Sequence, residues 1–283
     1  MVRLRFDKGT LLLAGEIGTP YGRWDPRVGC YRIKAMDYGN VLDYLEESRV
    51  PYRDEVKKLP PLEPLKCTVD LRSYQKEALF KWRKARMRGV LVLPTAAGKT
   101  YIALKAVSLL KTQTLIVVPT LDLIDQWRTR VKEGLGMEAG AVGGGENIVR
   151  MVTVSTYDSA YLHAELLGNR FMFVVFDEVH HLASPSYMQI AEMYIAPYRM
   201  GLTATYERSD ERHALLPRLV GDLIYTVNVE ELVGEHLSPY TYEKMYTELA
   251  PDELRTYENQ MTIFRKYLRE KGIVLKSAED FQK

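Results

Sequence analysis

Between residues 89 and 229 the chain repeats one pattern, a short run rich in Val and Ile followed by a stretch with helical spacing. Continuous apolar runs are typical of strands that are buried on both faces, and their alternation with helices predicts an α/β fold with a doubly wound parallel sheet. Ligands of such sheets bind at the carboxyl ends of the strands, so the residues after each run are candidates for function. The runs are GVLVLP (89–94), TLIVVP (114–119), VRMVTVS (149–155), FMFVVFD (171–177), RMGLTAT (199–205) and LIYTVNV (223–229).

The first run leads into a candidate phosphate-binding loop, LPTAAGKT (93–100). The usual pattern G-x-x-x-x-G-K-S/T requires a glycine where this chain has Leu93. A phosphate needs free N–H groups at a helix N-terminus, a lysine and a hydroxyl for Mg²⁺, and the end of the segment offers all three. Pro94 provides another way to turn, so we expect Leu93 to be the last strand residue; the alternative is a lookalike loop. The predicted nucleotide-binding residues are Pro94, Thr95, Ala96, Ala97, Gly98, Lys99 and Thr100.

A pair of carboxylates ends the fourth run. Asp177 is placed to hold the Mg²⁺ that bridges nucleotide phosphates, and Glu178 to orient or deprotonate the attacking water. By itself such a pair is more often an ordinary strand-to-loop turn, and the presence of Lys99 in a phosphate loop is what favours the metal site. His180 and His181 follow, but adjacent residues rarely chelate one ion, so we expect no metal on them.

Small hydroxyl-bearing residues end three other runs. Hydroxyl and N–H groups suit a polynucleotide backbone and carry no base information. The alternative is that these residues cap the helices that follow. The three segments, each small and rich in hydroxyls, are Pro119–Thr120, Ser155–Thr156 and Thr203–Ala204–Thr205.

The flanks predict further elements. Residues 2–13 read as a β-hairpin, residues 40–49 as a helix capped by Asn40, residues 59–65 as a proline-rich linker and residues 252–273 as a long amphipathic helix.

Composition adds few constraints. The two cysteines cannot by themselves hold an iron–sulfur cluster or a zinc ribbon. No apolar run approaches the ~18 residues that span a bilayer, so we expect no membrane partner. The net charge of +2 is too small to indicate nucleic acid, but seven cations lie within residues 72–88. These form either a solvated helix face or part of a DNA-binding surface.

Taken in order, six segments resemble the motifs of a superfamily 2 helicase core, and their layout is similar to the XPB (xeroderma pigmentosum group B) family, especially its archaeal members. The segments are LRSYQKEAL (71–79), LPTAAGKT (93–100), VVPTLDLIDQW (117–127), VSTYDSA (154–160), DEVHH (177–181) and GLTATYERSD (201–210). Residues 23–47 resemble the small damage-recognition domain of this family, and LAPDELRTYE (249–258) resembles the lead into its helical thumb.

The resemblance implies three parts. Residues 1–60 would be a small α+β, DNA-contacting domain, residues 68–237 a RecA-like ATP-binding domain with a parallel sheet, and residues 238–283 the start of the thumb. A second RecA-like domain, which supplies arginine fingers in this family, has no counterpart in the sequence, so the chain looks like the first half of a motor and is expected to be inactive alone.

The resemblance also implies a role for each matching residue. Gln75 and Arg72 would contact the adenine, Lys99 and Thr100 the phosphates and Mg²⁺, Asp177 the Mg²⁺, and Glu178 the attacking water. His180, Thr203, Ala204 and Thr205 would couple the nucleotide to DNA, whereas Pro119, Thr120, Ser155 and Thr156 would line the single-strand track. The Arg-Glu-Asp motif of the family is matched only at Arg208 and Asp210, because Ser209 occupies its centre.

The implied function is that of an ATP-dependent DNA helicase or translocase in nucleotide excision repair and, in eukaryotes, transcription. Its partners would be ATP, Mg²⁺, single-stranded or forked DNA and a nuclease, in the cytoplasm or, in a eukaryote, the nucleus. Two alternatives stay open: another superfamily 2 translocase of the restriction or remodelling type, and a non-catalytic module that binds DNA or a partner.

Overall fold

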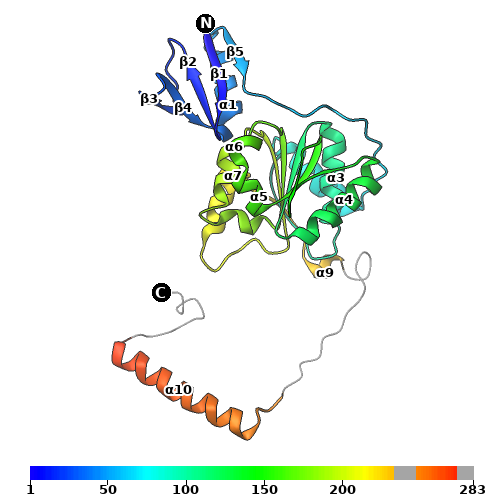
Figure 1. Cartoon of the computed structure of the whole chain (residues 1–283). Coiled ribbons are helices and arrows are strands. Elements are labelled where there is room, and N and C mark those ends of the chain that lie inside the picture. Colours follow the sequence, from blue (N-terminus) through cyan, green and yellow to red (C-terminus); the bar gives the residue numbers. More distant parts are fainter. Residues whose placement is uncertain (233–246, 273–283) are drawn as a thin grey trace. The chain divides into compact units, whose positions relative to one another are not determined.

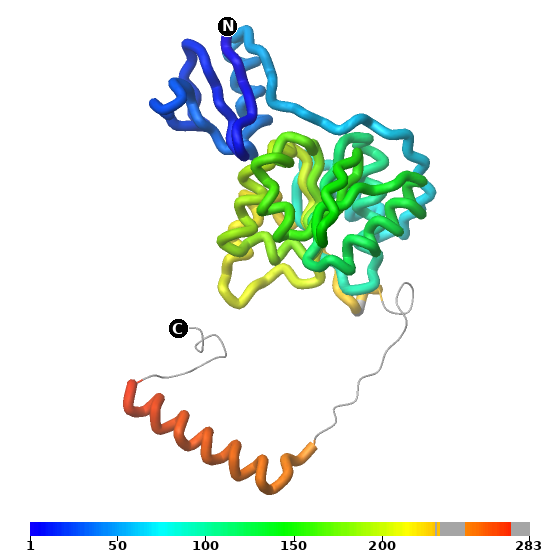
Figure 2. Tube along the Cα trace, in the orientation of Figure 1, coloured from blue at the N-terminus to red at the C-terminus, as the bar shows by residue number. Residues whose placement is uncertain are grey.

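The computed structural model describes residues 1–232 and 247–272, and Figures 1 and 2 trace the path of the chain. The chain divides into two compact units, Met1–Leu237 and Ser238–Lys283. In these described ranges, no helix is both long enough and apolar enough to cross a bilayer.

The first unit begins with a five-stranded sheet in the order β3-β4-β2-β1-β5. Its strands are β1 (Val2–Asp7), β2 (Thr10–Ala14), β3 (Gly22–Asp25), β4 (Cys30–Lys34) and β5 (Tyr52–Glu55). The predicted hairpin is confirmed, because β1 and β2 pair antiparallel with Asp7 opposite Thr10. Lys8 and Gly9 turn between them with positive φ angles of 46° and 79°, as two-residue hairpin turns require.

One helix packs with this sheet, and its start differs from the prediction. A short 3-10 turn, η1 (Ala35–Asp37), leads directly into α1 (Tyr38–Glu47). Tyr38 already has helical φ and ψ angles of −52° and −47°, so the helix begins before Asn40 and Asn40 is not its cap. Tyr38, Val41 and Leu45 are buried at helical spacing, which is why the sequence still identified the helix.

The larger sheet has eight strands in the order β13-β6-β12-β11-β7-β10-β8-β9. All six predicted runs are strands of it, and they pair in parallel, which confirms the α/β prediction. The short strands β8 and β9 were not predicted, and β9 is antiparallel to β8. The strands are β6 (Arg88–Val92), β7 (Thr114–Val118), β8 (Gly140–Gly143), β9 (Glu146–Ile148), β10 (Val152–Thr156), β11 (Phe173–Asp177), β12 (Tyr198–Thr203) and β13 (Leu223–Thr226).

Helices cover both faces of the larger sheet (Figures 1 and 2). One core layer contains buried side chains of α2 (Ser73–Lys84), α3 (Lys99–Leu110) and α4 (Leu121–Leu135). The other contains those of α5 (Tyr157–Leu162), α6 (Ala164–Leu167), α7 (Met188–Met193) and α8 (Leu216–Leu219). Short helical segments at η2 (Val179–Ala183), η3 (Arg212–Leu215) and α9 (Val229–Leu232) complete the unit. This two-layered covering is what a doubly wound sheet requires.

The smaller sheet packs against the larger domain. Ile195, which precedes β12, is fully buried in the core of the smaller sheet. The Asn169 amide donates to the Val56 carbonyl at 2.7 Å, and Lys34 pairs with Glu192 at 2.5 Å. The proline-rich stretch that follows forms no helix or strand, but the Pro60 carbonyl accepts a hydrogen bond from Gln113 at 2.7 Å.

The cations within residues 72–88 do not form one surface. Lys81, Arg83, Lys84 and Arg86 are exposed. Arg88 instead donates to the Val220 carbonyl at 3.3 Å, and burial lowers its pKa. Neither alternative for the cations of residues 72–88, a solvated helix face or a DNA-binding surface, holds for Arg88, because that residue begins β6 and turns into the protein.

In the second unit, the predicted amphipathic helix is α10 (Pro251–Lys271). The Glu253 carboxylate caps its first turn by accepting from the Ala250 N–H at 3.0 Å. Gly272 ends it in the left-handed conformation with φ of 66°, a common helix terminus. The rest of the predicted thumb, 238–246 and 273–283, lies outside the described residues.

Candidate nucleotide-binding site

The predicted functional motifs meet at one edge of the larger sheet. Thr203 pairs with Val92 across β12 and β6, and Asp177 pairs with Leu202 across β11 and β12. Thr156 pairs with Val118 across β10 and β7. Since these strands are parallel, the residues that follow each of them lie along the same carboxyl edge. The expectation that the polar motifs share an edge is confirmed.

Leu93 does not prevent the loop from forming. Its side chain is fully buried, and its N–H donates to the Thr203 carbonyl at 3.0 Å. β6 ends at Val92, so the expectation that Leu93 is the last strand residue is wrong by one residue: Leu93 keeps one backbone bond to β12 after the strand register has ended. The turn follows at Pro94, whose carbonyl accepts from the Ala97 N–H at 3.2 Å. Ala96 and Gly98 follow with positive φ angles of 65° and 73°.

Gly98 is the position where the loop tolerates no side chain. A Cβ there would lie 2.6 Å from the Gln75 amide nitrogen. Its left-handed φ is also unfavourable for an L-residue with a side chain. Gly98 thus allows the loop to lie against α2 and to enter α3 at Lys99.

Lys99 connects the loop with the acidic pair. Its side chain is 12% exposed, and its ammonium lies 3.9 Å from the Glu178 carboxylate. The same ammonium donates to the Leu93 carbonyl at 3.2 Å and approaches that of Pro94 at 3.5 Å. A fixed cation next to free helix N–H groups and a carboxylate is a suitable arrangement for a phosphate and its metal.

Asp177 is held by two donors. The Glu178 N–H donates to Oδ1 at 3.1 Å, and the Trp127 indole donates to Oδ2 at 2.9 Å. Burial raises the pKa of Asp177, and the hydrogen bond from Trp127 opposes that rise. The Tyr157 hydroxyl donates to the backbone carbonyl of Asp177 at 3.0 Å.

Glu178 is oriented by residues of the next strand and loop. It has an unusual positive φ of 47°, which turns the chain sharply after β11. Its Oε2 atom lies 3.1 Å from the Thr203 hydroxyl and 3.5 Å from His180 Nδ1. His180 Nδ1 and the Thr203 hydroxyl are also 3.1 Å apart, and the Thr205 N–H donates to that hydroxyl at 3.1 Å. Burial lowers the pKa of His180 and of His181, which favours their neutral forms.

Gln75 supports the loop from beneath. Only 3% exposed, it donates to the Ala97 carbonyl at 2.9 Å and accepts from the Arg72 N–H at 2.9 Å. The Tyr74 hydroxyl donates to the same Ala97 carbonyl at 2.8 Å. Contact of Gln75 or Arg72 with a base stays a prediction.

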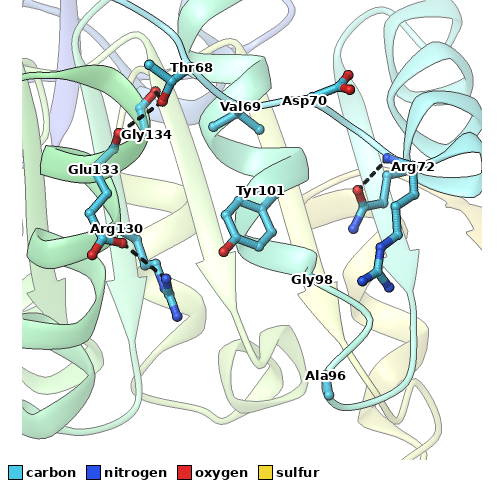
Figure 3. Close-up of a pocket in the computed structure, with 11 residues that line it drawn as sticks. Thr68, Val69, Asp70, Arg72, Ala96, Gly98, Tyr101, Arg130, Glu133 and Gly134 are labelled. Carbon is cyan, nitrogen blue, oxygen red and sulfur yellow. Dashed lines mark hydrogen bonds and ion pairs between the residues drawn. The ribbon is translucent and has the colours of Figure 1, made fainter. Parts of the chain in front are cut away.

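A cavity of about 310 Å³ opens beside this loop, and Figure 3 draws its lining. Arg72, Ala96 and Gly98 line it next to the loop, and Tyr101 and Arg130 extend it toward α4. The Arg130 guanidinium lies 5.8 Å from the centre of the Tyr101 ring. No sequence pattern pointed to Tyr101 and Arg130, because their side chains meet only after α3 and α4 pack together.

The predicted polynucleotide-contacting residues differ in exposure. Thr156 caps α5 by accepting from the Ser159 N–H at 3.1 Å, and Ser155 is fully buried. The helix-cap alternative therefore holds for Thr156. Thr120 is exposed and makes no such cap bond, and Pro119 is half-buried.

Arg208 and Asp210 form a bidentate pair, with both N–H···O distances at 2.8 Å. This pair holds the pKa of Asp210 well below its usual value. Arg208 also donates to the His180 carbonyl at 2.7 Å. The pair is thereby tied to the segment that follows Glu178.

The order of the sheet, the loop that enters α3 and the acidic pair after β11 together define a RecA-like domain of the helicase type. Residues 4–56 match the family profile described as "Xeroderma pigmentosum group B helicase damage recognition domain", and residues 68–208 match "Type III restriction enzyme, res subunit". The "DNA 3'-5' translocase XPB2" of Sulfurisphaera tokodaii is 42% identical over 283 residues, which is 100% of this chain and 64% of that protein. Over its whole length the chain is therefore similar to an archaeal XPB protein, and its first 56 residues include a match to the XPB damage-recognition profile.

More distant relatives match shorter regions. The "DNA 3'-5' helicase XPB" of Kineococcus radiotolerans is 34% identical over 55% of this chain and 29% of its own length. The "General transcription and DNA repair factor IIH helicase/translocase subunit XPB" of Schizosaccharomyces pombe is 28% identical over 59% of this chain and 23% of its own length. Among solved structures, the UvsW helicase from Bacteriophage T4 aligns with a TM-score of 0.48 at 18% identity, over 79% of this chain and 99% of that one. The chain spans less than two thirds of the length of the three curated relatives from Sulfurisphaera tokodaii, Kineococcus radiotolerans and Schizosaccharomyces pombe.

Proposed function

We propose that this chain is the ATP-binding part of an XPB-type DNA helicase or translocase that hydrolyses ATP to move along DNA. The observation that carries the proposal is the convergence of Lys99, Asp177 and Glu178 at one sheet edge, with the Lys99 ammonium 3.9 Å from Glu178. Relatives whose names describe DNA translocases and helicases support it.

The residues at this edge fit a nucleotide with Mg²⁺. Within the described ranges, no three His, Cys, Asp or Glu side chains gather as a metal site of their own. Mg²⁺ at nucleotide sites takes only one or two protein ligands, with phosphate and water oxygens as the others. Thr100 and Asp177 would supply the protein part, and the bound ion would neutralise phosphate charge. Gln75, Arg72 and the cavity beside Gly98 would take the adenine.

In this proposal each residue has one task. Lys99 neutralises phosphate charge, and Glu178 accepts a proton from the water that attacks the terminal phosphate. Thr203 and His180 hold the Glu178 carboxylate in place through the contacts at 3.1 and 3.5 Å. With Ala204 and Thr205, they would transmit the state of the nucleotide to the DNA-contacting loops. A second RecA-like domain would supply the arginine that stabilises charge during hydrolysis, a contribution worth about 10³–10⁵ in rate.

DNA would lie along the rim at Pro119 and Thr120, with Arg208 and Asp210 at its far end, whereas the side chains of Ser155, which is fully buried, and Thr156, which caps α5, would not contact it. Thr120 offers the most accessible hydroxyl of this rim. Contacts of this kind would follow the backbone without reading the sequence.

The smaller sheet offers a second surface for DNA. A cavity of about 730 Å³ is lined there by four cationic side chains and two carboxylates of residues 1–60, together with Arg218 of α8. Trp24, 54% exposed, and Tyr21, 38% exposed, lie among them. Aromatic rings between cations suit an unpaired base and its phosphates. We therefore assign DNA contact to residues 1–60, ATP binding to 68–237 and the start of a thumb to 238–283.

The biological role that we propose is DNA repair, by nucleotide excision, and transcription where the protein is eukaryotic. The name of the Schizosaccharomyces pombe relative includes both processes. A nuclease is the protein partner we expect, in the cytoplasm or nucleus. The restriction-type match over 68–208 supports another translocase as second candidate, but the match over 4–56 favours the XPB assignment.

One variant tests the proposal and separates it from a non-catalytic module. Glu178→Gln keeps the shape of the side chain and removes the base. Calorimetry should detect nucleotide binding in both proteins, whereas hydrolysis, measured with the second RecA-like domain present, should fall about 10²–10⁴-fold in the variant. If the unaltered protein binds no nucleotide, the remaining candidate function is that of a non-catalytic module that binds DNA or a partner.

A further inference from the structure

Trp127 contacts the acidic pair from a different element. It lies on α4, is 2% exposed, and its indole N–H donates to Asp177 Oδ2 at 2.9 Å. Fifty residues separate the two in sequence. An indole has a single hydrogen-bond donor and no acceptor, so this N–H is fully used by the carboxylate.

The contact fixes the direction of the carboxylate. Oδ1 is held by the N–H of the adjacent Glu178, a bond within the turn itself. Oδ2 is held only through Trp127 among the hydrogen bonds of the described residues. Without the indole, the carboxylate keeps one anchor and gains freedom to rotate about its last side-chain bond.

We propose that Trp127 is a positioning residue that orients Asp177 to hold Mg²⁺. The inference rests on the proposed function, which makes Asp177 the metal-holding carboxylate. Groups that hydrogen-bond to a metal ligand set its orientation, and their loss typically weakens metal affinity about 10–100-fold. Trp127 thereby acts through Asp177 and contacts neither metal nor nucleotide.

The position of Trp127 on α4 extends this role. α4 starts at Leu121, directly after Thr120 on the proposed DNA rim, and Arg130 on the same helix lines the cavity beside the phosphate loop. Six residues of helix separate Leu121 from Trp127, a rise of about 9 Å. A single rigid helix thus joins the rim, the Asp177 carboxylate and the cavity.

The chain contains a matched control. Trp82 is also buried, at 1% exposed, and its indole donates at the same distance of 2.9 Å, but to the Arg199 backbone carbonyl. Trp127→Phe and Trp82→Phe therefore each keep an aromatic ring and remove one buried hydrogen bond. Only Trp127→Phe removes a hydrogen bond from Asp177.

The experiment measures how much Mg²⁺ is needed for binding of a β,γ-imido analogue of ATP, by calorimetry. In Trp127→Phe the half-saturating Mg²⁺ concentration should rise about tenfold, with unchanged analogue affinity in EDTA. In Trp82→Phe both quantities should stay as in the unaltered protein. An equal Mg²⁺ requirement in all three proteins, or an equal rise in both variants, would overturn the proposal.

A second measurement does not depend on nucleotide binding. The three tryptophans give three indole N–H signals in a ¹H–¹⁵N spectrum, which the two Phe variants assign. Asp177→Asn should shift the Trp127 signal strongly and leave that of Trp82 in place. If the Trp127 signal does not shift in Asp177→Asn, the positioning role is rejected, even if Trp127→Phe fails to fold. If the unaltered protein binds no nucleotide but the signal shifts, the proposed function fails while the contact stands.

Discussion

The Thr203 hydroxyl and the Glu178 carboxylate meet across β12 and β11, with Oγ1 3.1 Å from Oε2. Thr203 is the last residue of β12 and Glu178 directly follows the last residue of β11, so the carboxyl edge of the sheet itself brings them together. Thr203 is fully buried, and the same hydroxyl accepts from the Thr205 N–H. Glu178, to which we assign water activation, is therefore connected to the loop after β12 through the Thr203 hydroxyl oxygen, which contacts both.

Thr203→Val should keep nucleotide binding and slow hydrolysis. The shape is retained, but the hydroxyl, which lies 3.1 Å from Glu178 Oε2 and 2.8 Å from the Thr205 carbonyl, is lost, and a hydrogen bond to a carboxylate is worth about 1.5–3 kcal/mol. Applied to the transition state, this corresponds to a fall in turnover of about 10–100-fold. Steady-state hydrolysis with the second RecA-like domain present measures it, and Thr203→Ser, which restores the hydroxyl, should recover most of the rate. Normal turnover in Thr203→Val would exclude a role for this contact.

Lys99→Ala should lower nucleotide affinity at least tenfold, because its ammonium is the cation fixed beside the loop. Calorimetry with ADP and Mg²⁺ measures this without hydrolysis. The control is Lys111→Gly at the other end of α3, where a φ of 47° suits glycine. An equal loss of ADP affinity in both variants would show that the effect comes from removing any positive charge, and not from a phosphate site at Lys99.

Gly98→Ala should damage nucleotide binding beyond its effect on stability. The left-handed φ of 73° costs about 1–2 kcal/mol for any L-residue. The added Cβ would also lie 2.6 Å from the Gln75 amide. Gly29→Ala shares the first penalty, with φ of 63°, but meets nothing within 4 Å. The Tm of thermal unfolding should fall in both variants, whereas ADP affinity should fall only in Gly98→Ala. Unchanged ADP affinity in Gly98→Ala would contradict the assignment of residues 94–100 as the phosphate-binding loop.

Asp25→Asn should destabilise the smaller sheet in a pH-dependent way. Hydrogen bonds from Arg27 and Arg32 hold the pKa of Asp25 well below its usual value. A carboxyl whose pKa is lowered by folding stabilises the protein above its unfolded pKa of about 3.9, and loses that effect as pH falls through the folded pKa. The difference in Tm between the unaltered protein and Asp25→Asn should be largest at neutral pH and should shrink below about pH 4.

The control for that series is Asp43→Asn on α1. Asp43 is exposed and forms no ion pair with any of the residues in 1–232 or 247–272. Its replacement should change Tm little at any pH. A Tm difference for Asp25→Asn that stays constant down to acid pH would show that the arginine pairs contribute no net stability.

Trp24→Ala should weaken binding of a single-stranded oligonucleotide. Stacking on an aromatic side chain is worth about 1–3 kcal/mol per base. Trp24 is 54% exposed, whereas Trp82 and Trp127 are 1% and 2% exposed. Oligonucleotide should therefore quench mainly Trp24 fluorescence, and Trp24→Phe should retain affinity while losing the quench. Equal affinity of the alanine variant would remove the smaller sheet from the DNA-binding surface.

The predictions that succeeded depended on local pattern. Each apolar run carried its own strand signal, and parallel pairing then placed Lys99, Asp177 and Thr203 at one edge. The contacts that were missed join residues far apart in sequence. Trp127 meets Asp177 only once α4 packs on the sheet, and Arg130 meets Tyr101 only between two helices. The start of α1 was missed because η1 had already set the helical backbone.

The burial of Ile195 in the core of the smaller sheet has a consequence for inheritance. Ile195 and Val56 are far apart in sequence but are buried in that same core. A gene rearrangement that moved residues 1–60 to another protein would leave Ile195 behind, together with Asn169 and its bond to the Val56 carbonyl. The transferred segment would then have an open core, and the donor an exposed apolar side chain. The two parts are therefore expected to be inherited together, although they are separate sheets.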